Sequence, residues 1–215
     1  MQRLKEEFLE KVEKVIPLSH LNVLELGCGD GSLSIEIAKR CRILNAIDPD
    51  EEKVKLARTR NIRNATFEVG SGDDLPFDNH RFNAVIFTLS LHHIAAEKMG
   101  PAIYEAIRVA NKTGWLVFLE PTESGTFFEA EIKFDAGDGD EQSSKAMAYK
   151  VIMSHEGLKS IREIDDETIF QFQSVNDFVE SMNPKRNLDE IKNFLESNNY
   201  ILKAGRRINI FQPRK

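Results

Sequence analysis

Three glycines at alternate positions, Gly27, Gly29 and Gly31, follow a short apolar run at residues 22–26. Glycines after a strand let the backbone turn sharply and let a ligand come closer than a Cβ would permit. The start of a following helix also offers free N–H groups. The Gly-x-Gly-x-Gly spacing differs from the Gly-x-Gly-x-x-Gly of dinucleotide-binding loops. Because Asp30 in the same loop is an unfavourable neighbour for a pyrophosphate, the loop favours a cationic or zwitterionic ligand.

Two later segments carry side chains suited to a nucleoside. Asp48 follows an apolar run at residues 43–47, and a carboxylate at that place can accept hydrogen bonds from both hydroxyls of a ribose. Ser71, Gly72 and Asp73 follow the next apolar run and offer small and polar groups to the edge of a base. Together with the glycine loop, these segments predict one nucleoside-sized site.

Short apolar strands that alternate with helices must position these residues. An N-terminal helix is predicted over residues 4–16, because apolar residues recur there at every fourth position. Strands separated by helical segments predict an α/β fold with a Rossmann-like, doubly wound, mostly parallel sheet. Right-handed crossovers then place the loops after the strands along one edge of the sheet, where ligands bind. The expected strands are residues 22–26, 43–47, 65–69, 84–88 and 115–119.

The C-terminal third departs from simple alternation. Residues 187–197 predict a helix, and two short strands on either side of residues 204–206 predict a hairpin, so the last strand is expected to be antiparallel. Residues 122–186 are too many for an ordinary loop. We expect them to form an inserted cap, or substrate region, over the ligand edge within a single domain of residues 1–215.

Charge and composition exclude several classes of protein. With 29 Lys and Arg against 35 Asp and Glu, the net charge is −6 and there is no basic block, which argues against DNA or RNA as the partner. The absence of an apolar run of about 18 residues predicts no membrane span. The charged N-terminus lacks the apolar centre of a signal peptide. The two cysteines, Cys28 and Cys41, cannot form a disulfide framework, so we expect a cytoplasmic location.

No metal site is predicted from the spacing of ligands along the chain. Neither the histidines nor the cysteines show metal-ligand spacing. The acidic, glycine-containing stretch at residues 135–141 lacks the pattern of an EF-hand. We interpret that stretch as a solvated hinge.

Four segments carry a family resemblance: VLELGCGDGSLSIEIA, AIDPD, GSGDDLPFDNHRFNAVIFTLSLHHI and IRVANKTGWLVFLEP. In order and spacing they resemble the class I S-adenosylmethionine-dependent methyltransferases. The pattern is closest to the branch that includes the ubiquinone- and menaquinone-biosynthesis C-methyltransferases. The resemblance covers residues 20–121 and implies a transferase with S-adenosyl-L-methionine as cofactor and S-adenosyl-L-homocysteine as product.

The resemblance also implies which residues bind the methionine and ribose parts of the cofactor. Gly27, Cys28 and Gly29 would line the methionine part, and Glu25 would support its ammonium group. Asp48 would bind the two ribose hydroxyls.

The adenine end is implied in the same way. Pro49 would lie beside the adenine, while Ser71, Gly72 and Asp73 would face its edge. Thr88 would lie near the methionine portion. Ser71 stands where many relatives have an aspartate that reads the adenine amine, so this chain departs from the family pattern there.

The resemblance implies transfer of the sulfonium methyl by in-line displacement. The protein must then align acceptor, methyl and sulfur, and exclude water. An oxygen or carbon acceptor also needs a proton removed, for which His92, His93 and Glu120 are the catalytic candidates. Each of these residues also has a purely structural interpretation. The histidines could pack in the following helix, and Glu120 could cap a turn. Tyr149 and His155 are weaker candidates in the cap.

The methyl acceptor is expected to be a small molecule. Residues 88–91 read Thr-Leu-Ser-Leu and lack the Asn/Asp-Pro-Pro-aromatic signature of enzymes that methylate exocyclic or amide nitrogens. The alternatives are an RNA or protein methyltransferase, or a non-catalytic protein that binds S-adenosylmethionine or S-adenosylhomocysteine. A nicotinamide oxidoreductase is disfavoured by the glycine spacing.

Overall fold

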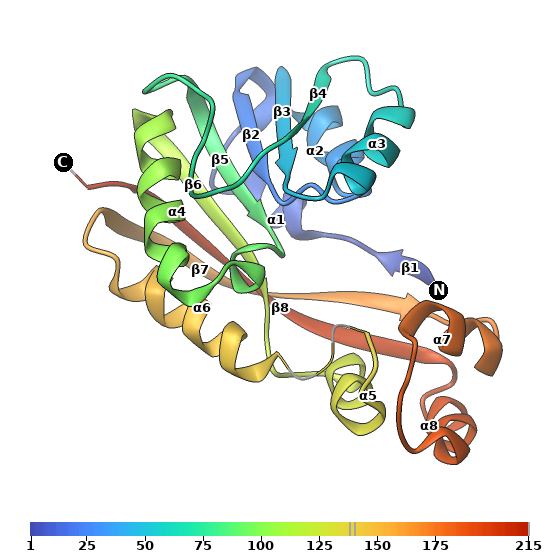
Figure 1. The fold of residues 1–215 in the computed structure, drawn as a ribbon. Coiled ribbons are helices and arrows are strands. Elements are labelled where there is room, and N and C mark those ends of the chain that lie inside the picture. The colour runs from blue at the N-terminus through green and yellow to red at the C-terminus, as the bar shows by residue number, and fades with distance from the viewer. Residues whose placement is uncertain (138, 140, 215) are drawn as a thin grey trace.

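The computed structural model describes residues 1–137, 139 and 141–214, which fold around one mixed sheet of eight strands (Figure 1). The strands lie in the order β1-β7-β8-β6-β5-β2-β3-β4. Their bounds are β1 (Gln2–Lys5), β2 (Asn22–Leu26), β3 (Ile43–Asp48), β4 (Ala65–Val69), β5 (Phe82–Thr88), β6 (Ala110–Pro121), β7 (Leu158–Gln171) and β8 (Ile201–Pro213).

Helices of one to four turns connect the strands. The α-helices are α1 (Phe8–Glu13), α2 (Ser34–Arg40), α3 (Glu51–Thr59), α4 (Ala96–Val109), α5 (Thr126–Phe134), α6 (Gln142–Ser154), α7 (Val175–Met182) and α8 (Ile191–Ser197). Short 3-10 helices are η1 (Leu18–His20), η2 (Leu91–His93) and η3 (Leu188–Glu190). Among the described residues, no helix combines the length and the apolar character needed to cross a membrane.

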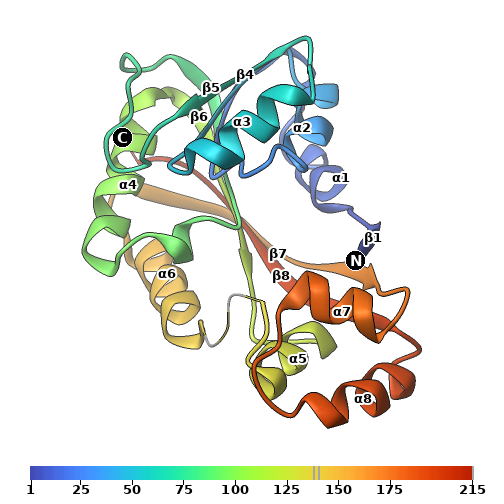
Figure 2. The same cartoon turned by 45° about the vertical axis from the view of Figure 1, so that its right-hand side comes forward.

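The five predicted strands form the parallel half of the sheet, which confirms the doubly wound fold. β4, β3, β2, β5 and β6 pair in parallel. Strands covered on both faces read as continuous apolar runs. In β5, for example, Ile86 faces the core under α1, α2 and α3, while Val85 and Phe87 face the core under α4 and α6. Figure 2 shows the two helical layers on opposite sides of the sheet.

The antiparallel half of the sheet confirms that the last strand is antiparallel to its neighbours, but residues 172–200, which include α7 and α8, connect β7 to β8 in place of a short turn. β8 pairs antiparallel with both β6 and β7, and the hairpin partners are β7 and β8. The predicted turn at residues 204–206 is wrong, because β8 runs straight through it. Gly205 serves a close approach instead: a Cβ there would lie 2.0 Å from the Ser124 hydroxyl oxygen, on the segment that follows β6.

The predicted N-terminal helix over residues 4–16 is too long at its start. Residues 2–5 form β1, which pairs antiparallel with β7 in the register Gln2↔Gln171 and Arg3↔Phe170, and α1 begins only at Phe8. The edge of β7 supplies backbone partners that a helix would not use. The guanidinium of Arg3 also lies over the ring of Phe170, 5.4 Å from its centre.

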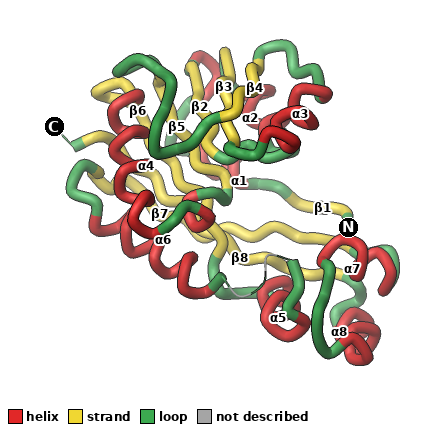
Figure 3. Tube along the Cα trace, in the orientation of Figure 1, coloured by secondary structure: helices red, strands yellow, loops and turns green. Residues whose placement is uncertain are grey.

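The far ends of β7 and β8 carry a separate small core. Figure 3 shows these two strands extending from the main body to α5, α7 and α8. Phe134, Phe178 and Leu195, one from each helix, are fully buried in it. Residues 158–171 lie inside the range expected to be a cap but form β7, a strand of the main sheet. The first half of this strand is rich in charged residues, so it lacks the apolar pattern from which a strand is predicted. Asp138 and Asp140 of the acidic stretch lie outside the described residues.

Candidate active site

A cavity of about 440 Å³ opens at the carboxyl edge of the parallel strands. Its walls come from the ends of β2, β3 and β5 and from the loops that follow β2, β3, β4 and β5. It is lined by six of the ten residues proposed from the sequence to bind the cofactor: Gly27, Gly29, Asp48, Pro49, Ser71 and Gly72. Glu25, Cys28, Asp73 and Thr88 do not line it and lie around or behind it.

The glycine loop has backbone angles that few other residues adopt. Gly27, Gly29 and Gly31 have φ values of +81°, +52° and +81°. At Gly27 there is also no room for a side chain, since a Cβ would lie 2.1 Å from the Cβ of Ser90. Ser90 is held there by a 2.7 Å hydrogen bond from its hydroxyl to the carbonyl of Leu26. The loop therefore needs glycine for conformation and, at Gly27, for space.

Asp48 is oriented by backbone groups on both sides. One oxygen accepts the N–H of Gly29 at 2.8 Å, and the other accepts the N–H of Asp50 at 3.0 Å. Each carboxylate oxygen can accept a further hydrogen bond. The helix α3 is capped by Asp50, which accepts the N–H groups of Glu52 and Lys53. Asp48 is therefore not needed as the cap and presents its remaining acceptor positions at the cavity wall.

Glu25 lies fully buried beneath the loop. The Ser34 hydroxyl, at the start of α2, donates to one oxygen at 2.6 Å, and Thr88 Oγ1 lies 3.0 Å from the other. Burial raises the pKa of Glu25 to about 7, although the bonds from Ser34 and Thr88 oppose that rise. The structure places Glu25 and Thr88 as a buried pair that ties β2, β5 and α2 together behind the cavity.

This raised pKa predicts a pH-dependent stability. Between pH 4.5 and 7 the unfolded chain loses the Glu25 proton while the folded protein keeps it, so the free energy of unfolding falls as pH rises through that window. The fall amounts to about 3 kcal/mol, at about 1.4 kcal/mol per pH unit. Glu25→Gln should remove this pH dependence, because an amide does not ionise in this range. The amide can still donate a hydrogen bond to Thr88 and accept one from Ser34, so the local packing is kept. Urea denaturation at pH 5 and pH 8 measures the difference; an unchanged difference in the variant would contradict the assignment.

The loop after β4 reaches the cavity with Ser71 and Gly72. The Ser71 hydroxyl donates to the Asp73 carboxylate, which also pairs with Lys98 on α4 at 2.9 Å. The hydrogen bond from Ser71 and the pairing with Lys98 lower the pKa of Asp73. Asp73 thus stabilises the conformation of the loop, and Ser71 and Gly72 are the residues of the loop that face the cavity.

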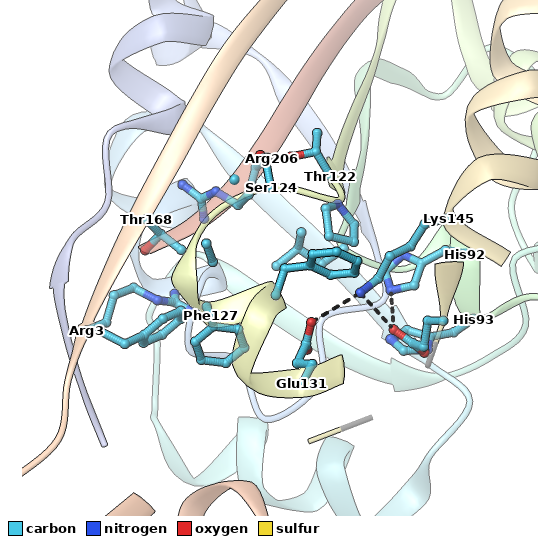
Figure 4. Close-up of a pocket in the computed structure, with 17 residues that line it drawn as sticks. Arg3, His92, His93, Thr122, Ser124, Phe127, Glu131, Lys145, Thr168 and Arg206 are labelled. Atoms are coloured by element: carbon cyan, nitrogen blue, oxygen red, sulfur yellow. Dashed lines mark hydrogen bonds and ion pairs between the residues drawn. The ribbon is translucent and has the colours of Figure 1, made fainter. Parts of the chain in front are cut away.

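A second cavity of about 160 Å³ adjoins the first (Figure 4). Three phenylalanine side chains form part of its wall: Phe127 and Phe128 from α5, and Phe170 from β7. Leu89 and His93 line both cavities. Leu89 has a φ of +54°, a strained conformation for a branched residue, and such strain tends to be stored at functional sites. Sequence reasoning missed Leu89, since no pattern in residues 88–91 marks its backbone conformation.

The histidine candidates lie at the junction of the two cavities. Glu120, at the end of β6, accepts the N–H groups of Ser90, Leu91 and His92, and one of its oxygens lies 2.5 Å from Nδ1 of His92. His92 and Glu120 are almost fully buried. Glu120 therefore caps η2 and fixes the ring of His92, which leaves Nε2 of His92 facing the second cavity. Glu120 itself lines neither cavity.

Charged residues that the sequence did not single out complete this wall. Glu141 lies 3.6 Å from Nε2 of His92 and 3.2 Å from Nδ1 of His93. Lys145 lies 3.6 Å from Glu141 and 3.4 Å from Glu131. Figure 4 shows His92, His93, Glu131 and Lys145 converging at one end of the cavity. Their positions in the sequence, on α5 and at the start of α6, gave no signal.

The weaker candidates, Tyr149 and His155, line neither cavity. The Tyr149 hydroxyl donates to Glu163 at 3.1 Å, and its ring lies under the guanidinium of Arg207. His155 packs against the ring of Tyr104 on α4. Both belong to surface packing between elements.

Comparison with known proteins supports the resemblance to methyltransferases. Residues 23–114 match the family model described as a methyltransferase domain. Over these residues, which are less than half of the chain, the sequence is similar to that domain. An "uncharacterized methyltransferase" of Staphylococcus carnosus is 27% identical over 124 residues, which cover 58% of this chain and 56% of that protein. The chain thus matches about half the length of its curated relatives.

Solved structures share the fold of this chain. A putative methyltransferase from Bacillus halodurans aligns with a TM-score of 0.68 at 17% identity, over 96% of this chain and 99% of that one. A SAM-dependent methyltransferase from Methanosarcina mazei aligns with a TM-score of 0.62 at 14% identity, over 97% of each chain. These likenesses show the fold; the branch that includes the quinone-biosynthesis enzymes stays a prediction.

Proposed function

We propose that the chain is an S-adenosylmethionine-dependent methyltransferase that transfers a methyl group to a small-molecule acceptor by in-line displacement. The observation that carries this proposal is the pair of adjoining cavities, which share Leu89 and His93 as a common wall. A cofactor in the larger cavity and an acceptor in the smaller one meet at that wall, as a direct transfer requires.

The larger cavity suits the proposed cofactor. The glycine loop, with no side chain at Gly27 or Gly29, takes the methionine part. Asp48 has acceptor positions left for the two ribose hydroxyls. Ser71 and Gly72 offer a hydroxyl and backbone groups to the adenine edge. Among the sequence candidates, Cys28, Glu25 and Thr88 would support this seat from behind.

The chemistry asks little of the protein beyond alignment, water exclusion and removal of a proton. The sulfonium methyl is already electrophilic, so a close-packed wall at Leu89 serves the first two needs. With Nδ1 bound to Glu120, His92 has its Nε2 lone pair available to accept the acceptor's proton. Glu120 is then a positioning residue, and His93 borders the path between the cavities.

The size of the second cavity supports a small acceptor. A cavity of about 150 Å³ holds one benzene-sized group, and this one is about 160 Å³. Its phenylalanine side chains suit an apolar part of the acceptor, and the polar side chains that also line it, such as His92, Thr168 and Arg206, suit polar groups. A net charge of −6 gives no support to a nucleic-acid acceptor.

Transfer of a labelled methyl group tests the proposal. Incubation with methyl-labelled S-adenosylmethionine should label a component of a small-metabolite extract, and not tRNA or an unfolded protein mixture. His92→Gln should lower the rate, by the factor of about 100 or more that a general base contributes, without loss of cofactor binding. Label in tRNA or protein would favour those acceptors, and cofactor binding without transfer to any pool would favour a non-catalytic binding protein.

A further inference from the structure

The side chains at the polar end of the second cavity have the donor atoms of a metal site. His92, His93 and Glu141 each offer one ligand atom, and these atoms lie within 4.8 Å of one another. Around a tetrahedral ion with bonds of about 2.0–2.1 Å, ligand atoms lie roughly 3.3 Å apart. The two nitrogen-to-carboxylate distances, 3.6 Å and 3.2 Å, are close to that spacing.

The ring of His92 is held as a metal-bound histidine is held. Metal-ligating histidines donate their other N–H to a carboxylate or carbonyl, which fixes tautomer and orientation. Here Glu120 accepts from Nδ1 at 2.5 Å and is itself fixed by three backbone N–H groups. That arrangement places Nε2 of His92 3.6 Å from an oxygen of Glu141, close enough for one cation, either a proton or a metal ion, to lie between the two atoms.

The charge of the surroundings favours a divalent ion. Glu120, Glu131 and Glu141 bring three negative charges to this part of the wall, and Lys145 brings one positive charge. With both imidazoles neutral, two negative charges are left, and all four charged side chains are largely buried. If Glu141 binds the ion, Lys145 keeps its second partner, Glu131, at 3.4 Å.

We propose that His92, His93 and Glu141 bind a divalent transition-metal ion such as Zn²⁺, with an open position toward the second cavity for an oxygen of the methyl acceptor. Two imidazoles and one carboxylate suit Zn²⁺, Co²⁺ or Fe²⁺ better than Mg²⁺ or Ca²⁺, which prefer all-oxygen sites. The spacing of ligands along the chain gave no sign of the site, because Glu141 is 48 positions after His93.

The bound ion, and not the imidazole of His92, would then promote loss of the acceptor's proton. This step rests on the proposed methyl transfer, whereas binding of the ion does not. An acceptor hydroxyl on the ion loses its proton to solvent more readily, as bound water does. Its oxygen then forms a bond to the methyl carbon, and the methyl–sulfur bond breaks with its electron pair left on sulfur. The products are the methylated acceptor, S-adenosylhomocysteine and one proton.

Titration of the tag-free, EDTA-treated full chain with Co²⁺, followed by visible absorption, tests the site. We expect one saturable equivalent that Zn²⁺ displaces. His93→Gln and Glu141→Gln should each weaken binding at least ten-fold, and Glu120→Gln by about 10–100-fold, as loss of an outer carboxylate does. Lys145→Met should strengthen binding, because it removes a positive charge beside the ion. The surface variant His20→Gln should leave binding unchanged.

Stabilisation by S-adenosylhomocysteine, measured on the same samples, shows that each variant is folded and reports the cofactor seat separately. No saturable Co²⁺ binding by the wild type would overturn the metal site and leave the proposed function standing. A loss in His20→Gln as large as in His93→Gln would also overturn it. Co²⁺ binding without any effect of S-adenosylhomocysteine would instead contradict the cofactor assignment.

Discussion

Asp48→Ala is expected to weaken binding of S-adenosylhomocysteine about 100-fold or more. The carboxylate would accept both ribose hydroxyls, and hydrogen bonds to a charged group contribute about 1.5–3 kcal/mol each. Loss of two such bonds corresponds to about two orders of magnitude in affinity. The variant also leaves the Gly29 N–H without its acceptor, which loosens the glycine loop. Isothermal titration calorimetry with wild type and variant measures the change.

Asp50→Asn is the matched control for Asp48→Ala. Asp50 lines the same cavity and is also a carboxylate, but its oxygen caps α3. Asparagine caps a helix as well as aspartate does, so the variant removes a charge from the cavity wall without disturbing the helix. We expect a change of a few-fold at most. If Asp48→Ala weakened binding no more than Asp50→Asn, the ribose role of Asp48 would be wrong.

Gly27→Ala is expected to have the largest effect on stability of any single methyl addition to the glycine loop. The positive φ costs a non-glycine residue about 1–2 kcal/mol. Displacement of Ser90, whose Cβ would lie 2.1 Å away, adds a further overpacking cost of about 1–3 kcal/mol. Gly29→Ala shares the positive φ but meets no atom within 4 Å. It should therefore lower the free energy of unfolding by only about 1–2 kcal/mol.

A second-site change separates the clash from the backbone strain. In the double variant Gly27→Ala/Ser90→Gly the serine side chain is gone, so only the backbone cost of the new alanine remains. Urea denaturation of wild type, both single variants and the double variant forms a complete cycle. We expect the double variant to be more stable than the sum of the single effects predicts. Strict additivity would show that Ser90 does not set the space at Gly27.

The larger cavity was predictable because the residues that line it are local in sequence. The glycine loop, Asp48 and the Ser71–Gly72 pair each follow an apolar run that forms a strand, and parallel strands bring their carboxyl ends to one edge. The order of these segments along the chain and the parallel pairing of the strands therefore determine which residues meet at this edge of the sheet. The same logic placed His92 and His93 after β5 at that edge.

The smaller cavity was not predictable, because its walls come from distant segments with no shared pattern. Phe127, Glu141 and Phe170 meet only through the packing of α5, α6 and β7. Gly205 read as a turn residue, whereas its lack of a side chain serves the close approach of Ser124. In the same way, β1 exists because the edge of β7 offers partners, which a local apolar pattern does not reveal.

Calorimetric titration of the wild-type chain with S-adenosylhomocysteine and, separately, with NAD tests the central claim most directly. The cavity at the glycine loop, with Asp48 at its wall and a glycine spacing that differs from that of dinucleotide-binding loops, predicts saturable binding of one S-adenosylhomocysteine and no binding of NAD. Binding of NAD in place of S-adenosylhomocysteine would contradict the assignment of this cavity and, with it, the proposed methyl transfer.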